Sequence, residues 1–326
     1  MRTMIAGTGS YTPENVLTNA ALEEIVDTTD AWIVERTGIR ERRVAAADEA
    51  ASDLGHEAAR RALDMAGVAA ADLDGIIVAT VTGDVPWPST AALIQGRLGA
   101  RKAFAFDVSA ACAGSLYALA VGDRFVASGA ARRVLVIGAD VMTRVVDWKD
   151  RNTCVLFGDG AGAMLLAPID DAGRGIHSTH LYCDGTQAGI LGIPGGGSRK
   201  PLSVELIQAR EHFIKMNGRE VYRTAVQALE ACSLDALRAN EMGPDDVAHV
   251  IAHQANKRIL DATLERLGVP ASKCWMNLDR YGHTSAARVA IALDEANRAG
   301  GLTPGDVVLM MGIGAGMAWG SAVVRW

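Results

Sequence analysis

The chain has 326 residues, of which 49% are hydrophobic and 21% charged, and its formal net charge is −6. This composition is typical of a globular protein with a large core, and the acidic balance excludes a general affinity for nucleic acid. No window approaches the roughly 20 consecutive apolar residues that a membrane span needs, so no membrane partner is expected.

The N-terminus and the cysteines indicate the compartment. Met1–Gly7 runs into strand-like sequence that then turns polar, so we expect no signal peptide. The five cysteines are odd in number and widely spaced, with no Cys-x-x-Cys pair and no zinc-type spacing. We therefore expect a cytoplasmic protein without disulfides. His177 and His180 form an isolated His-x-x-His, and without a third ligand nearby we expect no metal site.

The first half of the chain alternates helical and strand-like segments. A helix is predicted over Ser52–Ala66, followed by a buried strand over Gly75–Thr80. The run Asp107–Gly114 consists largely of small residues, contains Cys112 and leads into an apolar helical stretch. A second buried strand is predicted over Arg133–Asp140.

The second half repeats this order. Helical segments are predicted over Asn217–Leu234 and Leu237–Asn240, followed by a strand over Val247–Ala252. His283 precedes another apolar helix, and a strand over Asp306–Gly314 follows. Continuous apolar strands between amphipathic helices favour mostly parallel sheets that are buried on both faces. The sequence therefore predicts two copies of one α/β unit.

One cysteine and two histidines stand at the ends of these predicted elements, a pattern that suits covalent acyl chemistry. Cys112 directly precedes a helix, whose unpaired amides and partial positive charge favour the thiolate. His253 follows a strand and His283 precedes a helix, and imidazole acts as a base or a donor near neutral pH. Each residue also has a structural interpretation. A cysteine among alanines is often a small buried apolar residue, and a histidine after a buried strand is often a satisfied structural group.

Ordered motifs extend over the whole chain: Gly7–Tyr11, Trp32–Arg42, Asp107–Gly114, Phe157–Gly162, His253–Asn256, Tyr281–Ala287 and Trp319–Trp326. With these motifs the chain resembles the β-ketoacyl-[acyl carrier protein] synthase III family of the thiolase superfamily. One departure is serious, because this chain has His283 where the family's motif has asparagine.

The resemblance implies a thiolase-like α/β fold, in which duplicated halves form a five-layer α-β-α-β-α arrangement. Residues 1–170 would form the N-terminal half with the nucleophile, and residues 171–326 the C-terminal half with both histidines. Such a duplication places Cys112 and His283 at equivalent positions, so that both face one site. The glycine-rich segment Gly192–Pro201 is expected to be a flexible connection between the halves. The resemblance also implies a homodimer, since the family's acyl pocket is shared between subunits.

The reaction implied by the resemblance is a decarboxylative Claisen condensation by an acyltransferase. A short acyl-CoA primer would react with malonyl-[acyl carrier protein] to give a β-ketoacyl product, which initiates fatty acid synthesis. Cys112 would carry the acyl group, and the backbone N–H groups of Cys112 and Ala315 would form the oxyanion hole. His253 and His283 would donate hydrogen bonds to the malonyl thioester oxygen. No metal and no resident cofactor is implied, because acyl-CoA is a substrate.

The resemblance also implies a CoA site. Trp32 and Arg151 would stack on the adenine, and Arg36 would lie near the phosphates. Planar indole and guanidinium faces suit a purine, and the positive charge suits phosphate. Asn256 would contact the pantetheine.

Two further surfaces follow from the same resemblance. The acidic carrier protein would dock on Lys257, Arg258 and Arg266, although Glu265 interrupts this basic face. Trp87 would reach across the dimer interface to the end of the acyl pocket, and its size favours short primers such as acetyl or propionyl.

His283 leaves the acyl acceptor open. Asparagine is a donor that never titrates, whereas histidine donates only in the right tautomer or when protonated. A Cys-His-His set is similar to that of chain-elongating condensing enzymes, so condensation remains chemically sensible. The alternative is a specialised condensing enzyme or a non-condensing acyltransferase that passes the acyl group to another acceptor in secondary metabolism. A catalytically silent binding protein is disfavoured, because the nucleophile and both histidines are present.

Overall fold

The computed structural model describes residues 2–326. The strands are β1 (Arg2–Tyr11), β2 (Asn15–Thr18), β3 (Glu41–Val44), β4 (Gly75–Ala79), β5 (Phe104–Val108), β6 (Val134–Val141), β7 (Asp159–Ile169), β8 (Gly175–Cys183), β9 (Leu191–Gly192), β10 (Lys215–Met216), β11 (His249–Ala252), β12 (Val307–Gly314) and β13 (Ala318–Arg325). The α-helices are α1 (Asn19–Glu23), α2 (Asp30–Thr37), α3 (Ala51–Ala66), α4 (Thr90–Leu98), α5 (Gly114–Ala127), α6 (Arg151–Cys154), α7 (Val204–Gln208), α8 (Gly218–Ala239), α9 (Lys257–Leu267), α10 (Leu278–Tyr281) and α11 (Arg288–Arg298).

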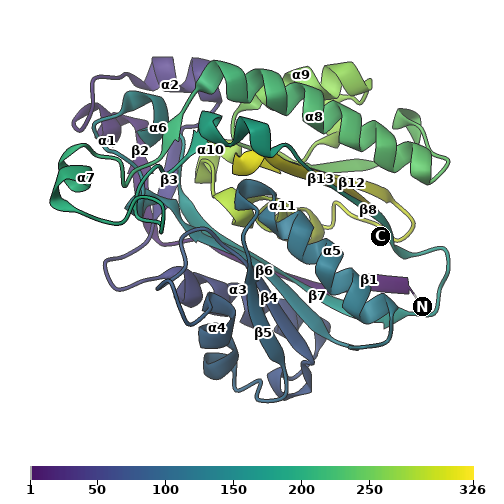
Figure 1. Ribbon diagram of the computed structural model, residues 1–326. Helices are drawn as coiled ribbons and strands as arrows, with labels where there is room; N and C mark the ends of the chain where they lie inside the picture. The colour runs from purple at the N-terminus through teal and green to yellow at the C-terminus, as the bar shows by residue number, and fades with distance from the viewer. Residues whose placement is uncertain (1) are drawn as a thin grey trace.

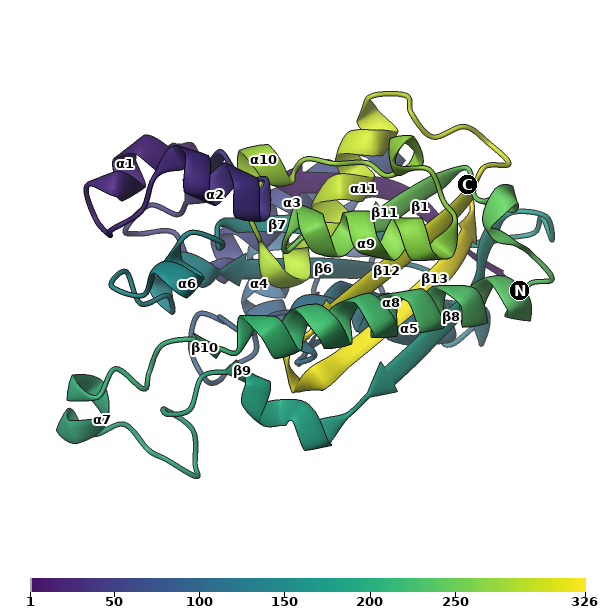
Figure 2. The same cartoon turned by 90° about the horizontal axis from the view of Figure 1, so that it is seen from above.

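Two principal sheets and three helical layers make up the body of the molecule. One sheet has the strand order β1-β7-β6-β4-β5, and the other has the order β11-β12-β13-β8. Helices α3 and α4 cover the outer face of the first sheet, and α5 and α11 lie between the two sheets (Figure 1). Helices α8 and α9 cover the outer face of the second sheet, as the view from above also shows (Figure 2). The predicted five-layer arrangement is confirmed.

Strand β4 shows why the sheets are apolar on both faces. All of its residues are buried. Ile76 and Val78 pack into the cluster that contains α3, whereas Ile77 and Ala79 pack into the cluster that contains α5. Because successive side chains of a strand point to opposite faces, a strand covered on both sides must be apolar at every position.

The direction of the strands differs from the prediction. Strand β4 is parallel to β5 and β6, but β7 is antiparallel to both β6 and β1. In the second sheet β11 is parallel to β12, and the other two pairs are antiparallel. The prediction of mostly parallel sheets was therefore wrong. A continuous apolar run reports burial on two faces and carries no information about strand direction.

The two sheets repeat one topology. The series β1, β7, β6, β4 corresponds in order and direction to β8, β13, β12, β11. Strand β5 has no complete counterpart, but a single parallel bridge between Val250 and Cys274 lies at the equivalent position. The division at residues 170 and 171 stays a prediction, and it would fall between the end of β7 and the start of β8. Gly192–Pro201 lies beyond β8 in the second half, so it is not the connection between the halves.

Most predicted elements are present with small shifts of their bounds. Helix α3 and strands β4, β6, β11 and β12 begin and end within two residues of the prediction. The two helical segments predicted between residues 217 and 240 form one continuous helix, α8. This helix ends at Ala239 with Asn240 as its C-cap, beyond which the chain turns toward β11.

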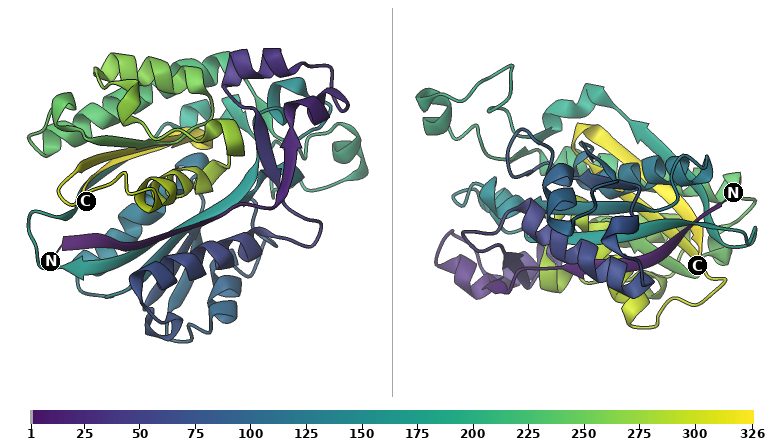
Figure 3. Two further views of the ribbon diagram at one scale, coloured as in Figure 1. Left: turned by 180° about the vertical axis from the view of Figure 1, so that it is seen from behind. Right: turned by 90° about the horizontal axis from the view of Figure 1, so that it is seen from below.

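The segment between β9 and β10 is the most prominent departure from the layers. It carries the short helix α7 and projects away from the body of the molecule (Figure 2). The two ends of the described chain lie at the same end of the molecule (Figure 3). Within residues 2–326, no helix is both long and apolar enough to cross a membrane.

Candidate active site

Cys112 lies in a short 3-10 turn, η2 (Ala111–Ala113), directly before α5. Ala111 in this turn has a φ of 45°, an uncommon conformation for a residue with a side chain. Gly314, at the end of β12, packs against the same turn. A Cβ added at Gly314 would lie 2.5 Å from the backbone nitrogen of Cys112, so only glycine allows this close approach. The turn therefore holds Cys112 against the end of the second sheet.

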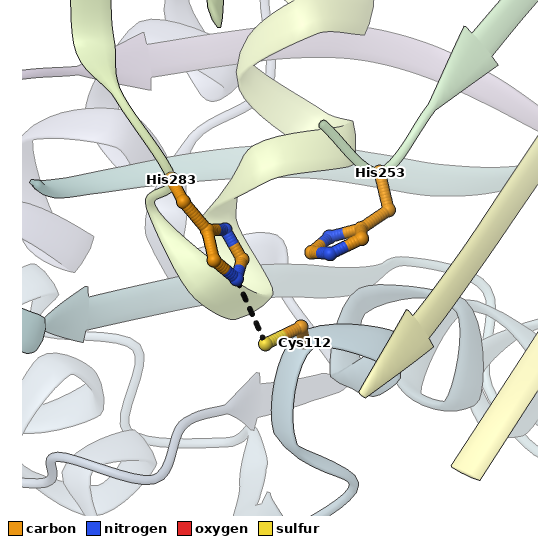
Figure 4. Close-up of side chains that lie close together, drawn as sticks. All are labelled: Cys112, His253 and His283. Carbon is orange, nitrogen blue, oxygen red and sulfur yellow. Dashed lines mark hydrogen bonds between the residues drawn. The ribbon is translucent and has the colours of Figure 1, made fainter. Parts of the chain in front are cut away.

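His253 and His283 reach Cys112 from the other half of the chain (Figure 4). His253 directly follows β11, and His283 lies between α10 and the 3-10 turn η7 (Ser285–Ala287), which leads into α11. The Sγ atom of Cys112 lies 3.2 Å from Nε2 of His283. The two imidazole rings meet edge to face, with 4.6 Å between their centres. The three residues singled out in the sequence thus converge on one point.

The backbone of Ser285 selects the tautomer of His283. Its N–H group donates a hydrogen bond to Nδ1 of His283, with a nitrogen–nitrogen distance of 3.2 Å. A nitrogen that accepts a hydrogen bond carries no proton, so in the neutral ring the proton is on Nε2. Phe157 stacks on the same ring, with 4.9 Å between the ring centres. The neutral ring of His283 therefore presents an N–H donor toward Cys112.

The same hydrogen bond argues against a metal centre. One donor atom each from Cys112, His253 and His283 lies within 4.8 Å of the other two, which is close enough to consider a metal ion. A ligating histidine offers a lone pair to the metal and donates a hydrogen bond from its other nitrogen. His283 has the opposite arrangement, because Nδ1 accepts the Ser285 N–H and Nε2 carries the proton. The residues favour acid–base and hydrogen-bond chemistry over metal binding.

Burial dominates the ionisation of Cys112, which is 6% exposed. It raises the pKa of the thiol to about 12, although a hydrogen bond from Ser285 opposes the rise. Ser285 Oγ lies 3.6 Å from the sulfur. We expected the helix start to favour a thiolate, but desolvation outweighs this effect and the resting nucleophile is a neutral thiol.

Both histidines are neutral as well. They are 5% and 4% exposed, for His253 and His283 respectively. Burial and, to a smaller extent, the positive charge of Arg288 lower the pKa of His253 to about 3. Burial, His253 and Arg288 together hold the pKa of His283 well below its ordinary value. Because neither ring is protonated near pH 7, the donor at His283 depends on its tautomer alone.

Two cavities meet at Cys112, and a third connects them to the surface. An inner cavity of about 220 Å³ is lined by Cys112, Ser285 and Ala315, together with apolar residues that include Met142, Val145, Phe157, Leu191, Ile193 and Ile214. A narrow channel of about 50 Å³ continues from it, shares Cys112, Phe157 and Leu191 with it, and is also lined by His253 and His283. An outer basin of about 680 Å³ shares Leu156, Met216, Val221, Ala255 and Ile259 with the channel. A substrate can therefore extend from the surface to the sulfur and beyond it.

The outer basin contains three of the four residues assigned to CoA by resemblance, Trp32, Arg36 and Asn256, and Arg151 lies beside it. The guanidinium carbons of Arg36 and Arg151 lie 5.1 and 5.0 Å from the centre of the Trp32 ring. Two successive stacking contacts need about 7 Å, so an adenine placed between Trp32 and Arg151 must displace the guanidinium outward.

Asn256 also lines the outer basin, but its side chain is already engaged. Its Oδ1 accepts the backbone N–H of Arg258 at 2.9 Å and so caps α9, while its Nδ2 donates to the carbonyl of Arg36 at 2.9 Å. Asn256 therefore joins α9 to the end of α2 and positions the wall of the basin. A contact with pantetheine stays a prediction.

The three basic residues expected at a docking surface differ in their surroundings. Lys257 pairs with Asp261 at 2.7 Å, and Arg266 pairs with Glu230 at 2.6 Å. Arg258 has no ion pair among residues 2–326 and lines the outer basin. Of the three, Arg258 is the one whose charge is available at the entrance.

Trp87 lies outside the cavities of its own chain. It is 84% exposed, in a loop whose Val81 lines the inner cavity. This exposure leaves the indole free to enter a second subunit, and the expected role across an interface stays a prediction.

Several site residues were not found from the sequence. Ser285 follows His283 by two residues, and that proximity was the one available signal. Phe157 and Arg219 are contributed by other segments, Phe157 beneath His283 and Arg219 in the outer basin. Arg288, behind the histidines, resembles an ordinary surface residue at the start of a helix. Packing between distant segments brings these residues to the site, and no local sequence pattern indicates that position.

Sequence models of one family match two parts of the chain. The model for the 3-oxoacyl-[acyl-carrier-protein (ACP)] synthase III C-terminal region matches residues 237–326, and that for 3-oxoacyl-[acyl-carrier-protein (ACP)] synthase III matches residues 106–185. The β-ketoacyl-[acyl-carrier-protein] synthase III of Caldanaerobacter subterraneus subsp. tengcongensis is 49% identical over 99% of this chain and 97% of its own. The corresponding protein of a Roseiflexus species is 50% identical over 99% of this chain and 98% of its own. The chain belongs to the β-ketoacyl-[acyl carrier protein] synthase III family.

Solved structures agree with this assignment. The 3-oxoacyl-[acyl-carrier-protein] synthase III of Aquifex aeolicus is 44% identical and superposes with a TM-score of 0.93, covering 99% of this chain and 100% of its own. The priming β-ketosynthase of a polyketide biosynthetic pathway is 37% identical, with a TM-score of 0.92 over 99% of this chain and 96% of its own. The fold is therefore thiolase-like, and the protein is an acyltransferase of the synthase III type.

Proposed function

We propose that this synthase III family member condenses a short acyl-CoA primer with malonyl-[acyl carrier protein] in the cytoplasm, through an acyl group held on Cys112. One observation supports this above the others. The Cys112 sulfur lies 3.2 Å from an imidazole N–H, at the junction of an apolar inner cavity and a channel to the surface. The inner cavity of about 220 Å³ suits a short acyl chain, and the channel suits a pantetheine arm.

In the first half-reaction the Cys112 sulfur attacks the thioester carbon of acyl-CoA. The thiol proton passes to His253, whose Nδ1 has no hydrogen-bond partner among residues 2–326, and from there to the departing CoA sulfur. The carbonyl oxygen becomes an oxyanion, which the N–H groups of Cys112 and Ala315 stabilise. The products are acyl-Cys112 and CoA, and no net charge is created.

In the second half-reaction malonyl-[acyl carrier protein] replaces CoA. The bond to its carboxylate breaks, CO₂ leaves, and the electron pair remains as an enolate on the thioester. His253 and His283 donate hydrogen bonds to the enolate oxygen, in a site that excludes water. The enolate carbon then bonds to the acyl carbon, the bond to sulfur breaks, and the electron pair returns to Cys112, which takes up a proton.

The surroundings of the site suit these substrates. Trp32, Arg36 and Arg151 would hold the nucleotide end of CoA at the outer basin, and Arg258 would meet the acidic carrier protein there. In the expected homodimer, Trp87 of each subunit would close the inner cavity of the other. No resident cofactor takes part, because each bond change is accounted for by the substrates and the three side chains.

A second function is favoured by one relative. The priming β-ketosynthase mentioned above belongs to a polyketide pathway, so the same condensation here would begin a secondary metabolite. A transfer to an alcohol or amine would need a base in place of a donor at position 283. The tautomer of His283 argues against that. Its unprotonated nitrogen, Nδ1, accepts the N–H of Ser285, and the nitrogen that faces the sulfur, Nε2, carries the proton.

The test follows both half-reactions in one sample. Incubation with acetyl-CoA should add one acetyl group, which peptide mass spectrometry should locate on Cys112. Addition of malonyl-[acyl carrier protein] should then release one CO₂ per acetyl group and yield acetoacetyl-carrier protein. Cys112→Ser is the control and should carry no thioester label. Labelling that persists at Cys154 or Cys274, or product formation without CO₂, would contradict the proposal.

A further inference from the structure

Arg288 is a fully buried arginine behind the two histidines. It is 0% exposed, begins α11 and follows His283 by five residues. Among residues 2–326 it forms no ion pair with any carboxylate, and its Nε and Nη1 atoms have no hydrogen-bond partner. A buried cation without a paired anion is costly, so its presence next to an active site calls for a physical reason.

The hydrogen bonds of Arg288 reach the segments that carry both histidines. Its Nη2 atom donates to Oε1 of Gln254 at 2.8 Å, and Gln254 is the residue after His253. The same nitrogen donates to Oδ1 of Asn277, which lies before α10 and His283. The backbone N–H of Asn277 donates to the same Gln254 oxygen at 3.1 Å. Arg288 thus joins the end of β11 to the segment leading to His283.

The acidic group that acts most strongly on Arg288 is engaged elsewhere. Glu295, two turns further along α11, accepts hydrogen bonds from Trp275, Asn277, Arg280 and Tyr281. Its charge is therefore shared with Arg280, which contacts it at 3.0 Å. Arg288 keeps an excess of positive potential on the side of the histidines, and it depresses the pKa of both rings.

We propose that Arg288 is a positioning residue that also supplies a fixed positive potential for the negative charge that forms on the substrate beside His253 and His283. The inference rests on the proposed function, in which a thioester oxyanion and an enolate form in turn beside His253 and His283. In the resting site neither histidine is a cation, so the Arg288 guanidinium is the permanent buried positive charge on that side of the site. In a poorly solvated interior such a charge acts over several ångströms without touching the substrate.

A matched pair of variants separates the effect of the positive charge of Arg288 from the effect of its hydrogen bonds. Arg288→Lys keeps the charge and one donor, whereas Arg288→Gln keeps a donor and loses the charge. We expect Arg288→Lys to retain both half-reactions within about 3-fold of the unchanged protein. Arg288→Gln should lose on the order of 10- to 100-fold in the rates of acylation and condensation. The KM for acyl-CoA should stay unchanged in both, because Arg288 does not line the outer basin.

The same pair at Arg42 controls for the loss of any buried guanidinium. Arg42 is also 0% exposed, and its guanidinium donates to the carbonyls of Leu17 and Val155 and to Oδ1 of Asn19, with no hydrogen bond to the segments that carry the histidines. Lys and Gln at position 42 should give equal rates. If Arg288→Gln does not fold, as judged by its thermal melt, Arg288→Met replaces it as the uncharged member of the pair.

The outcomes distinguish the two proposals. Equal rates for the charged and uncharged variants at position 288 would overturn the role of the charge. A rise in KM with unchanged turnover would also overturn it, since that pattern belongs to substrate binding. If the unchanged protein acylates Cys112 but releases no CO₂ from malonyl-carrier protein, the proposed condensation fails. The Arg288 pair can then still be judged on acylation alone.

Discussion

His283 is the residue at which the sequence motif predicts a departure from the family, and its replacement gives the sharpest test of the chemistry. In His283→Ala the N–H donor 3.2 Å from the Cys112 sulfur is lost. The Ser285 amide loses its acceptor and the Phe157 ring loses its stacking partner. The first loss bears on catalysis, and the other two bear on local stability.

The size of the catalytic effect follows from the burial of the site. A donor aimed at a developing oxyanion in an enclosed site contributes about 2.7–4 kcal/mol, which corresponds to about 10²–10³ in rate. His283 is 4% exposed, so water cannot easily take its place. Condensation should therefore fall by roughly 10²–10³-fold, whereas acylation of Cys112 should change by less than about 10-fold, because backbone amides serve that step.

His283→Asn is the matched variant. An amide side chain restores a donor that does not titrate, although it is shorter than imidazole and does not stack on Phe157 in the same way. We expect condensation to recover to within about 10-fold of the unchanged protein. Acetyl transfer from labelled acetyl-CoA measures the first step, and malonyl-dependent CO₂ release from the isolated acetyl-enzyme measures the second. Thermal melts of both variants control for stability.

An equally profound loss of condensation in His283→Asn and His283→Ala would refute the donor hypothesis. It would mean that the ring supplies something an amide cannot, namely a lone pair for a proton. That result would favour transfer to an alcohol or amine acceptor. A large loss of acylation in both variants would instead place His283 in the first half-reaction.

Two more predictions concern the nucleophile and the acyl cavity. Because burial raises the pKa of the Cys112 thiol to about 12, alkylation of Cys112 by iodoacetamide should accelerate about tenfold per pH unit from pH 6 to 9, measured by peptide mass spectrometry in a Cys183→Ser background. A plateau near pH 7 would show that the helix start outweighs burial. Trp87→Gly should admit longer or branched acyl-CoAs if the indole closes the partner's cavity, whereas Trp87→Phe should keep a preference for short primers. An unchanged chain-length profile in the glycine variant would remove Trp87 from the pocket.

The fold could be predicted where burial alone determines the pattern. Strands β4, β6 and β12 lie between helical layers, so their residues are apolar apart from Asp140 in β6, and their bounds are visible in the sequence. Their direction could not be read, since an apolar run is the same in both directions. The duplication compensated for this in part, because it predicted equivalent positions for Cys112 and His283. Cys112 lies within the turn before α5, and His283 lies two residues before the matching turn, η7.

The residues of the site could be predicted from the sequence, but their ionisation could not. Motif positions identified Cys112, His253 and His283, and the geometry brings all three together. The ionisation of Cys112 depends on how many groups cover it, which no local sequence pattern contains. Ser285 and Arg288 escaped notice for the same reason, as their partners lie in segments far away along the chain.

If the family has asparagine at this position, as the motif predicts, these environments allow a histidine to take over its role as a donor. An asparagine amide donates at every pH, and a histidine equals it only if it stays neutral and keeps its proton on the correct nitrogen. Burial and the charge of Arg288 satisfy the first condition, since they hold the pKa of His283 well below its ordinary value. The Ser285 amide satisfies the second by occupying Nδ1. Because the depressed pKa keeps the ring neutral throughout the physiological range, the donor should not be lost as the pH rises from 6 to 8. In this proposal, histidine in place of asparagine changes the reach and shape of the donor, and its role as a hydrogen-bond donor to the enolate oxygen is conserved.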